Sequence, residues 1–176
     1  MGNMAIFKAT FIKNNARKIA AGKAHIRYIQ NRRGKDGEKI TRTLFNADGA
    51  MGRWEAYRMI EEADRGSVMY RLVINFDAEK EDTHKDIYIQ EVIEKTMLGL
   101  ENRFRQPVQW VAATHGDHTP LRHVHIFAIL PQKLQVYDLN ALRQITTEAA
   151  REQRQERDKA LEKQREKGEP QWERQR

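Results

Sequence analysis

Histidines are concentrated in one short stretch of this chain. Four of the six lie within HGDHTPLRHVHIF (115–127). His123 and His125 are two residues apart in an apolar run typical of a strand, so both side chains point to the same face of a sheet. Their neighbours Val124 and Ile126 point to the opposite face, where a hydrophobic core can cover them.

A third histidine can join this pair across a hairpin. His115 follows an apolar run, 108–114, that also reads as a strand, and an antiparallel turn would bring it back beside His123. Three imidazoles would then converge on one point, as a three-ligand metal site requires, with coordination positions left for water or substrate. A hydrogen-bonded histidine cluster without a metal is the alternative interpretation.

Two further residues of the turn bear on this site. Asp117 could accept the second N–H of a ligand imidazole and so fix its tautomer. His118 could replace His115 as a ligand or lie exposed in the turn. Imidazole ligands suit manganese, zinc, nickel or cobalt better than magnesium. We therefore expect any of these four ions to bind more tightly than magnesium.

Tyr28 differs from the other four tyrosines, which we interpret as packing residues. Its neighbours one helical turn away are Ala24, His25, Asn31 and Arg32, which form a small and polar surface. A tyrosine on such a basic helix face is a plausible nucleophile toward phosphate, since the chain has no cysteine. A phenol of pKa ~10 needs assistance at neutral pH, for which Asp117 and His25 are candidates.

The elements that must position these residues follow from periodicity and turn residues. Strands are predicted over 5–12, 69–77, 108–114 and 123–130. Helices are predicted over 14–34, 52–66 and 82–104, and a last helix begins at residue 138; a loop is predicted over 32–49. Asn14 or Asn15 is expected to cap the first helix, and Gly34 to end it.

This order of strands and helices predicts an α+β domain over 1–150, with a largely antiparallel central sheet flanked by helices. Residues 151–176, almost all charged or glutamine, are expected to form a helical extension or connector.

Positive charge is concentrated in the first third of the chain. The net charge is +7, yet residues 1–53 hold 12 Lys/Arg against 3 Asp/Glu. A polyanion could dock there, although a solubilising surface would look the same. No apolar run is long enough to span a membrane and no signal-peptide core is visible, so we expect a cytoplasmic protein. Together with a metal site that has open positions, this charge suggests phosphate chemistry on a nucleic acid. The basic residues expected to contact it are Arg17, Lys23, Arg27, Arg32, Arg33 and Lys35.

Three segments together resemble a known family. HIRYIQNRRG (25–34), YRLVINFDAEKED (70–82) and WVAATHGDHTPLRHVHIFAIL (110–130) look like the DNA-nicking domain of conjugative relaxases in the HUH endonuclease superfamily. The nearest branch contains plasmid-mobilisation relaxases and the T-DNA border endonuclease. Two departures are Asn75, where relatives often have serine, and a loop after His115 that is one residue longer than in some relatives.

The resemblance implies an activity and partners. His115, His123 and His125 would hold a divalent metal, manganese or magnesium in function, and Tyr28 would attack the scissile phosphate of single-stranded DNA at an origin-of-transfer-like site. The products would be a 5′-phosphotyrosyl enzyme and a free 3′-hydroxyl. Accessory relaxosome proteins and a coupling protein would be partners. His25 as nucleophile, a rolling-circle replication initiator and a non-cutting metal-containing DNA-binding module are the alternatives.

Overall fold

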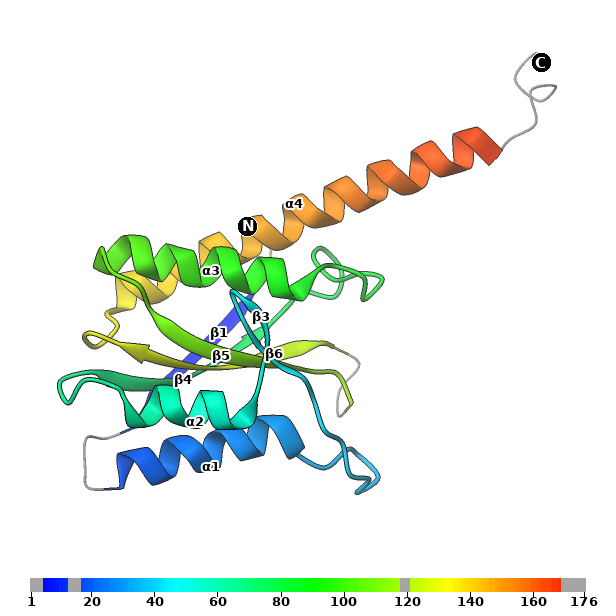
Figure 1. Cartoon of the computed structure of the whole chain (residues 1–176). Coiled ribbons are helices and arrows are strands. Elements are labelled where there is room, and N and C mark those ends of the chain that lie inside the picture. The colour runs from blue at the N-terminus through cyan, green and yellow to red at the C-terminus, as the bar shows by residue number, and fades with distance from the viewer. Residues whose placement is uncertain (1–4, 13–16, 118–120, 169–176) are drawn as a thin grey trace, which may run out of the picture.

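A single antiparallel sheet with helices on both faces makes up the fold (Figure 1). The computed structural model describes residues 5–12, 17–117 and 121–168. All strand pairs in it are antiparallel, which confirms the predicted α+β class. The order across the sheet is β1 (Ile6–Phe11), β4 (Val68–Asn75), β6 (His123–Leu130), β5 (Gln109–His115), β2 (Leu44–Asn46) and β3 (Gly49–Met51).

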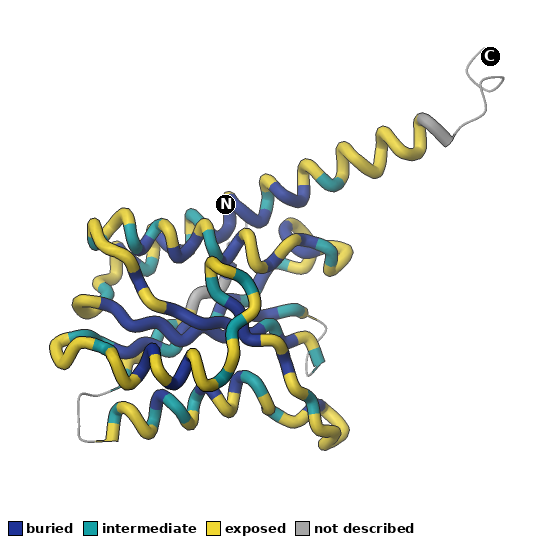
Figure 2. The backbone as a smooth tube through the Cα atoms, viewed as in Figure 1, coloured by how far each residue is buried: buried dark blue, intermediate teal, exposed yellow. Residues whose placement is uncertain are grey.

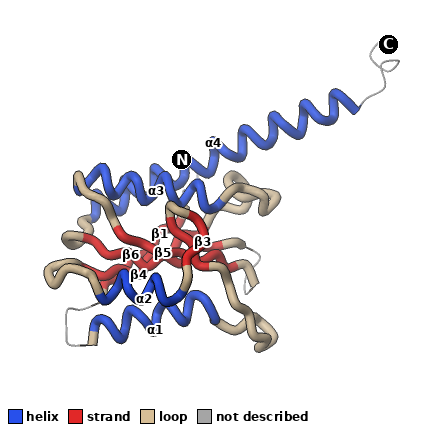
Figure 3. Tube along the Cα trace, in the orientation of Figure 1, coloured by secondary structure: helices blue, strands red, loops and turns tan. Residues whose placement is uncertain are grey.

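The helices form two layers with the sheet between them (Figure 3). One layer holds α1 (Lys18–Asn31) and α2 (Arg53–Glu61), and the other holds α3 (Ile89–Phe104) and α4 (Val136–Gly168). Each layer covers its own hydrophobic core, because alternate residues of a strand face opposite sides. Every residue of β6 is buried, which explains why this strand reads as a continuous apolar run interrupted only by its histidines.

The hairpin of β2 and β3 corrects the predicted loop over 32–49. Each strand has three residues, and a single residue pair, Phe45 with Ala112, joins β2 to β5. Segments this short carry no readable alternation, so their strand character depends on the neighbouring β5. The hairpin extends the sheet beyond the strands that local pattern predicts.

Helix ends also differ from the predictions. α1 begins at Lys18 with Arg17 as its N-cap and ends at Asn31, before Gly34; Asn14 and Asn15 lie outside the described residues. The chain leaves the helix at Arg32, whose ψ of 128° is extended. α3 begins at Ile89 instead of residue 82. Residues 82–88 form a loop, because their acidic side chains pair with arginines elsewhere in the chain.

Two tyrosines that were expected to pack, Tyr88 and Tyr137, are exposed, and so is Trp54. Trp54 is 80% exposed, because the buried side of α2 is formed by Ala56, Tyr57, Met59 and Ile60. Tyr88 and Tyr137 are 63% and 58% exposed, so our interpretation of both as packing residues is wrong. Their rings instead lie beneath the guanidinium groups of Arg157 and Arg103.

The last helix packs along its first half and leaves the domain along its second (Figure 2). Burial continues one turn past Ala150, through Gln153 and Arg154, and residues 158–166 are exposed. The predicted change from a packed to a solvated helix therefore comes later than the charge pattern suggested. None of the helices within the described residues is both long enough and apolar enough to cross a membrane.

Candidate metal centre

The register of β5 and β6 brings the three predicted histidines together. His115 pairs directly with His123, and Ala113 pairs with His125. The ring centroids are 5.4 Å apart for His115 and His123, 4.5 Å for His115 and His125, and 5.2 Å for His123 and His125. One potential ligand atom of each lies within 4.8 Å of the others, so the cluster could hold a metal ion. The predicted antiparallel pairing and convergence are confirmed.

Hydrogen bonds fix how two of the rings present their nitrogens. His115 Nε2 lies 2.7 Å from the carbonyl oxygen of Ile29 on α1, so Nε2 carries the hydrogen and Nδ1 keeps its lone pair. His123 is hydrogen-bonded to the backbone of Leu121. Asp117 was expected to accept the N–H of a ligand imidazole; for His115 a backbone carbonyl takes that role. Carbonyl acceptors of this kind are common behind metal-bound histidines.

The remaining ring nitrogens fit a cation. His115 Nδ1 and both nitrogens of His125 are buried and have no hydrogen-bond partner among the described residues. A buried polar atom left in this state costs roughly 1–3 kcal/mol. A bound cation would take the lone pair of His115 Nδ1 and the one lone pair of His125, whose other nitrogen carries a hydrogen. Three imidazoles are a donor set that transition metals accept.

The histidines are neutral at physiological pH. Burial is the main cause, and it lowers the pKa of His115 to about 4 and of His125 to about 3. The pKa of His123 is also lowered, first by burial and then by the positive charges of Arg32 and Arg42. Since a histidine must be deprotonated to bind a metal, these ligands need no proton release near pH 7.

Two residues of α1 lie over this cluster. The Tyr28 ring is 6.1 Å from the His125 ring and nearly perpendicular to it, and the His25 ring is 6.5 Å from the same ring. Tyr28 and His25 stack at 6.0 Å. Tyr28 is 45% exposed, which is less than Tyr88 or Tyr137. Its contact with the histidines, rather than its exposure, distinguishes it from the other tyrosines.

The predicted DNA-binding residues lie in three different surroundings. Arg32 lies near the cluster, with its guanidinium carbon 5.7 Å from the centre of the Tyr28 ring. Lys23 and Arg27 face α2, where they contact Glu61 and the Tyr57 hydroxyl. Arg33 donates to the Gly37 carbonyl; Arg17 and Lys35 are exposed. His118 lies outside the described residues.

Two further arginines at the site were missed by sequence reasoning. Arg42 is buried and donates to Asp117 Oδ1 at 2.6 Å and to the Arg32 carbonyl at 2.8 Å. Arg71 on β4 lowers the pKa of His25 to about 4, together with burial, which is the larger cause. Arg42 lies in a segment without periodicity, and Arg71 looks like any polar residue of an alternating strand. Neither gives a local signal.

Comparisons with known proteins do not place the chain in a family. A scan against models of protein families finds no match, and a search of curated proteins finds none either. The likeness to relaxases therefore stays a prediction from the sequence motifs.

Removal of one ligand should weaken metal binding strongly. His123→Ala deletes an imidazole at the edge of the cluster and should lower the affinity for Mn²⁺ by more than the roughly 10–100-fold expected for losing an outer-shell partner. Isothermal titration calorimetry measures the change. His84→Ala, which removes an exposed histidine from a loop, is the matched control and should leave the affinity unchanged. Equal affinity in wild type and His123→Ala would exclude this metal site.

The neutral histidines should make the metal-free protein sensitive to mild acid. His25, His115 and His125 have folded-state pKa values of about 4, 4 and 3, against 6.5 when unfolded. Only the unfolded chain binds protons as the pH falls below 6.5, so stability is complete above that pH and declines toward pH 4. The thermal midpoint of chelator-treated protein should fall between pH 6.5 and 5, before most carboxylates titrate. A constant midpoint over that interval would contradict the neutral cluster.

Proposed function

We propose that this protein is a relaxase: a metal-dependent enzyme that nicks and rejoins one strand of DNA at a specific site by tyrosine transesterification. The observation that carries the proposal is the position of Tyr28 beside His125, at 6.1 Å between rings. A phenol next to a three-imidazole site combines a nucleophile with a place for a cation, as phosphoryl transfer requires. The role would lie in conjugative transfer or mobilisation of plasmid or integrative-element DNA.

In this reaction the side chains of the chain have distinct tasks. His115, His123 and His125 would hold the divalent ion, manganese or magnesium in function, and that ion would screen the charge of the scissile phosphate. Tyr28 Oη attacks phosphorus in line, and the bond from phosphorus to the 3′-oxygen breaks. The 5′ end remains on Tyr28 as a phosphodiester, and the 3′-oxygen takes up a proton. Because one phosphodiester replaces another, the strand can be rejoined by the reverse step without ATP.

His25 is the better of the two candidates for accepting the Tyr28 proton. Burial lowers the pKa of His25 to about 4, so at pH 7 it is a neutral but weak base. Its ring lies 6.0 Å from that of Tyr28, and its Nε2 has no hydrogen-bond partner among the described residues. The Asp117 carboxylate, by contrast, pairs with Arg42 at 2.6 Å. His25 is also the alternative nucleophile, although Tyr28 is the more exposed of the two side chains.

The surroundings of Tyr28 suit an unpaired, negatively charged strand. Arg32 and Arg42 bring positive charge to the cluster. The same face of the sheet continues onto β1 and β4, where Lys8 and Thr10 are exposed and Thr10 pairs with Arg71. A single strand reaches such a surface more easily than a duplex, because its backbone is not held in a helix. The partners would be single-stranded DNA, relaxosome proteins and a coupling protein, in the cytoplasm.

Tyr28→Phe should abolish strand cleavage while leaving the fold intact. The change removes one oxygen from a half-exposed ring, so the stability should stay within about 0.5 kcal/mol of wild type. Wild type given Mn²⁺ and a single-stranded oligonucleotide with its nick site should form a covalent adduct that survives denaturation. Gel electrophoresis detects the adduct, and peptide mapping should locate the DNA on Tyr28.

Tyr88→Phe is the matched control, since it removes the same atom from an exposed tyrosine outside the cluster. It should form the adduct as wild type does. An adduct that persists in Tyr28→Phe would move the nucleophile to another residue, with His25→Ala the next variant to test. If wild type binds metal and DNA but forms no adduct with a library of transfer-origin sequences, the non-cutting DNA-binding module would replace the enzyme.

The salt dependence of binding should show that DNA lies on the face of the sheet that carries His115, His123 and His125. Affinity for a thymidine oligonucleotide should fall with salt, at a log–log slope of about −0.7 per phosphate neutralised. Arg32→Gln combined with Arg71→Gln should flatten the slope by about 1.4, if each arginine contacts one phosphate. Fluorescence anisotropy at several salt concentrations measures the slope. Lys159→Gln combined with Arg165→Gln removes the same charge from exposed α4 and should not alter it; equal flattening by both pairs would indicate non-specific charge.

A further inference from the structure

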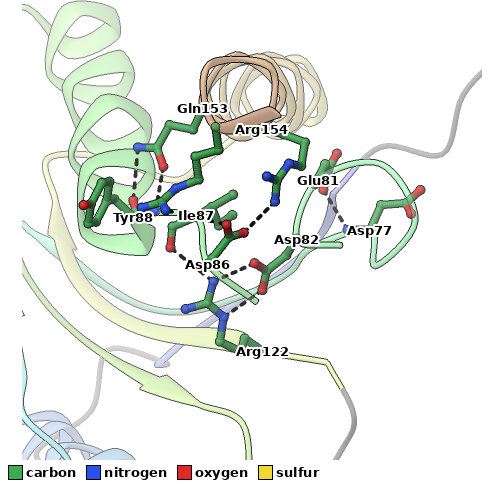
Figure 4. A network of polar contacts seen from close by, with 10 residues as sticks. Asp77, Glu81, Asp82, Asp86, Ile87, Tyr88, Arg122, Gln153 and Arg154 are labelled. Carbon is green, nitrogen blue, oxygen red and sulfur yellow. Dashed lines mark hydrogen bonds and ion pairs between the residues drawn. The ribbon is translucent and has the colours of Figure 1, made fainter. Parts of the chain in front are cut away.

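The residue that precedes a metal ligand is held by a buried carboxylate. Arg122 donates to both oxygens of Asp82, at 2.7 and 2.6 Å, and to the Ile87 carbonyl at 3.1 Å (Figure 4). The Asp82 side chain is only 3% exposed. Two parallel hydrogen bonds fix the orientation of a guanidinium group as well as its position. The backbone next to His123 is therefore tied to the loop that precedes α3.

That loop is itself anchored to α4. Arg154 donates to Asp86 at 2.5 Å, and Gln153 accepts from the backbone N–H of Tyr88 at 2.6 Å (Figure 4). Arg157 lies over the Tyr88 ring, 4.2 Å from its centre. Asp82 thus belongs to a packed segment that contacts with α4 hold in place, and it can act as a fixed point for Arg122.

His123 needs such a fixed point because it is the first residue of its strand. The pairs of His123 with Asn75 and with His115 are the last of their ladders, so no strand pairing extends to residues 121 and 122. The His123 ring is nevertheless hydrogen-bonded to the backbone of Leu121. The contacts that hold Arg122 therefore also hold the neighbouring Leu121 carbonyl, which orients the His123 imidazole.

We propose that Asp82 is a positioning residue of the metal centre. By clamping Arg122 it holds the backbone at Leu121, which orients the His123 ring so that its second nitrogen faces His115 and His125. Asp82 touches neither the metal nor the substrate. This inference rests on the metal centre of the proposed function but not on DNA cleavage.

Asp82→Asn tests the proposal through metal affinity. The variant keeps the shape of the side chain but removes the charge and one acceptor, and it should weaken Mn²⁺ binding by about 10–100-fold, as expected for an outer-shell partner. Calorimetry measures the affinity. The ¹⁵N shifts of the His123 ring in metal-free protein should also move, which a loss of stability alone would not cause.

Asp138→Asn is the matched control. Asp138 is an equally buried carboxylate that accepts from Arg103 at 2.7 Å, and it follows the far end of β6, after Leu130. This variant should lower the thermal midpoint and leave the Mn²⁺ affinity unchanged. Arg122→Lys covers the case in which Asp82→Asn does not fold, since it keeps the charge but loses the two-pronged contact; it should show a smaller loss of affinity.

Each outcome separates this inference from the proposed function. An affinity within twofold of wild type in Asp82→Asn, or in Arg122→Lys where the former does not fold, overturns the positioning role and leaves the metal centre and the nicking reaction standing. An equal loss of affinity in Asp138→Asn also overturns it, since any destabilisation would then suffice. If wild type binds no Mn²⁺, the positioning role and the proposed function both fail.

Discussion

The antiparallel register of β5 and β6 is the constraint on which the site depends. His115 lies opposite His123 and Ala113 lies opposite His125, and this register gathers three imidazoles on one face. A shift by one residue would turn His123 and His125 into the core beneath α3 and α4. Burial on both faces of β6 opposes such a shift, because Val124 and Ile126 would then have to leave the opposite core. The hydrophobic pattern of the strand therefore protects the geometry of its polar residues.

The helix layer over this face completes the site in two ways. It excludes water, which lowers the pKa of the histidines and keeps them neutral, and it supplies the Ile29 carbonyl that fixes the tautomer of His115. The same helix carries Tyr28, next to Ile29, and His25, one turn before Ile29. One packing contact, in which Ile26 and Ile29 are completely buried against the sheet, thus positions both the candidate metal ligand His115 and the proposed nucleophile.

Charge around the cluster is arranged on both sides of the loop between β5 and β6. Arg42 pairs with Asp117 where β5 ends, and Asp82 pairs with Arg122 where β6 begins. Breaking a buried ion pair by removing one partner costs several kcal/mol, so both pairs hold their backbones firmly. Arg32 and Arg42 also lower the pKa of His123, which means that the site combines neutral ligands with nearby positive charge. Such a combination attracts an anion, such as a phosphate, which would balance the charge of a bound cation.

Sequence alone determined the fold class, the pairing of the last two strands and the three clustered histidines; its choice of Tyr28 over four other tyrosines stays a prediction. These follow from local rules: the two-residue period of a strand, the spacing of a helix face and the chemistry of imidazole. Only the tertiary structure decided what depends on distant contacts. Three features join segments 40 or more residues apart: the pairing of β2 with β5, the ion pair of Arg42 with Asp117 and that of Arg122 with Asp82. The exposure of Trp54 and Tyr88 depends on which side of their element is covered. No short window of sequence contains both partners of such a contact, so its pattern could not reveal them.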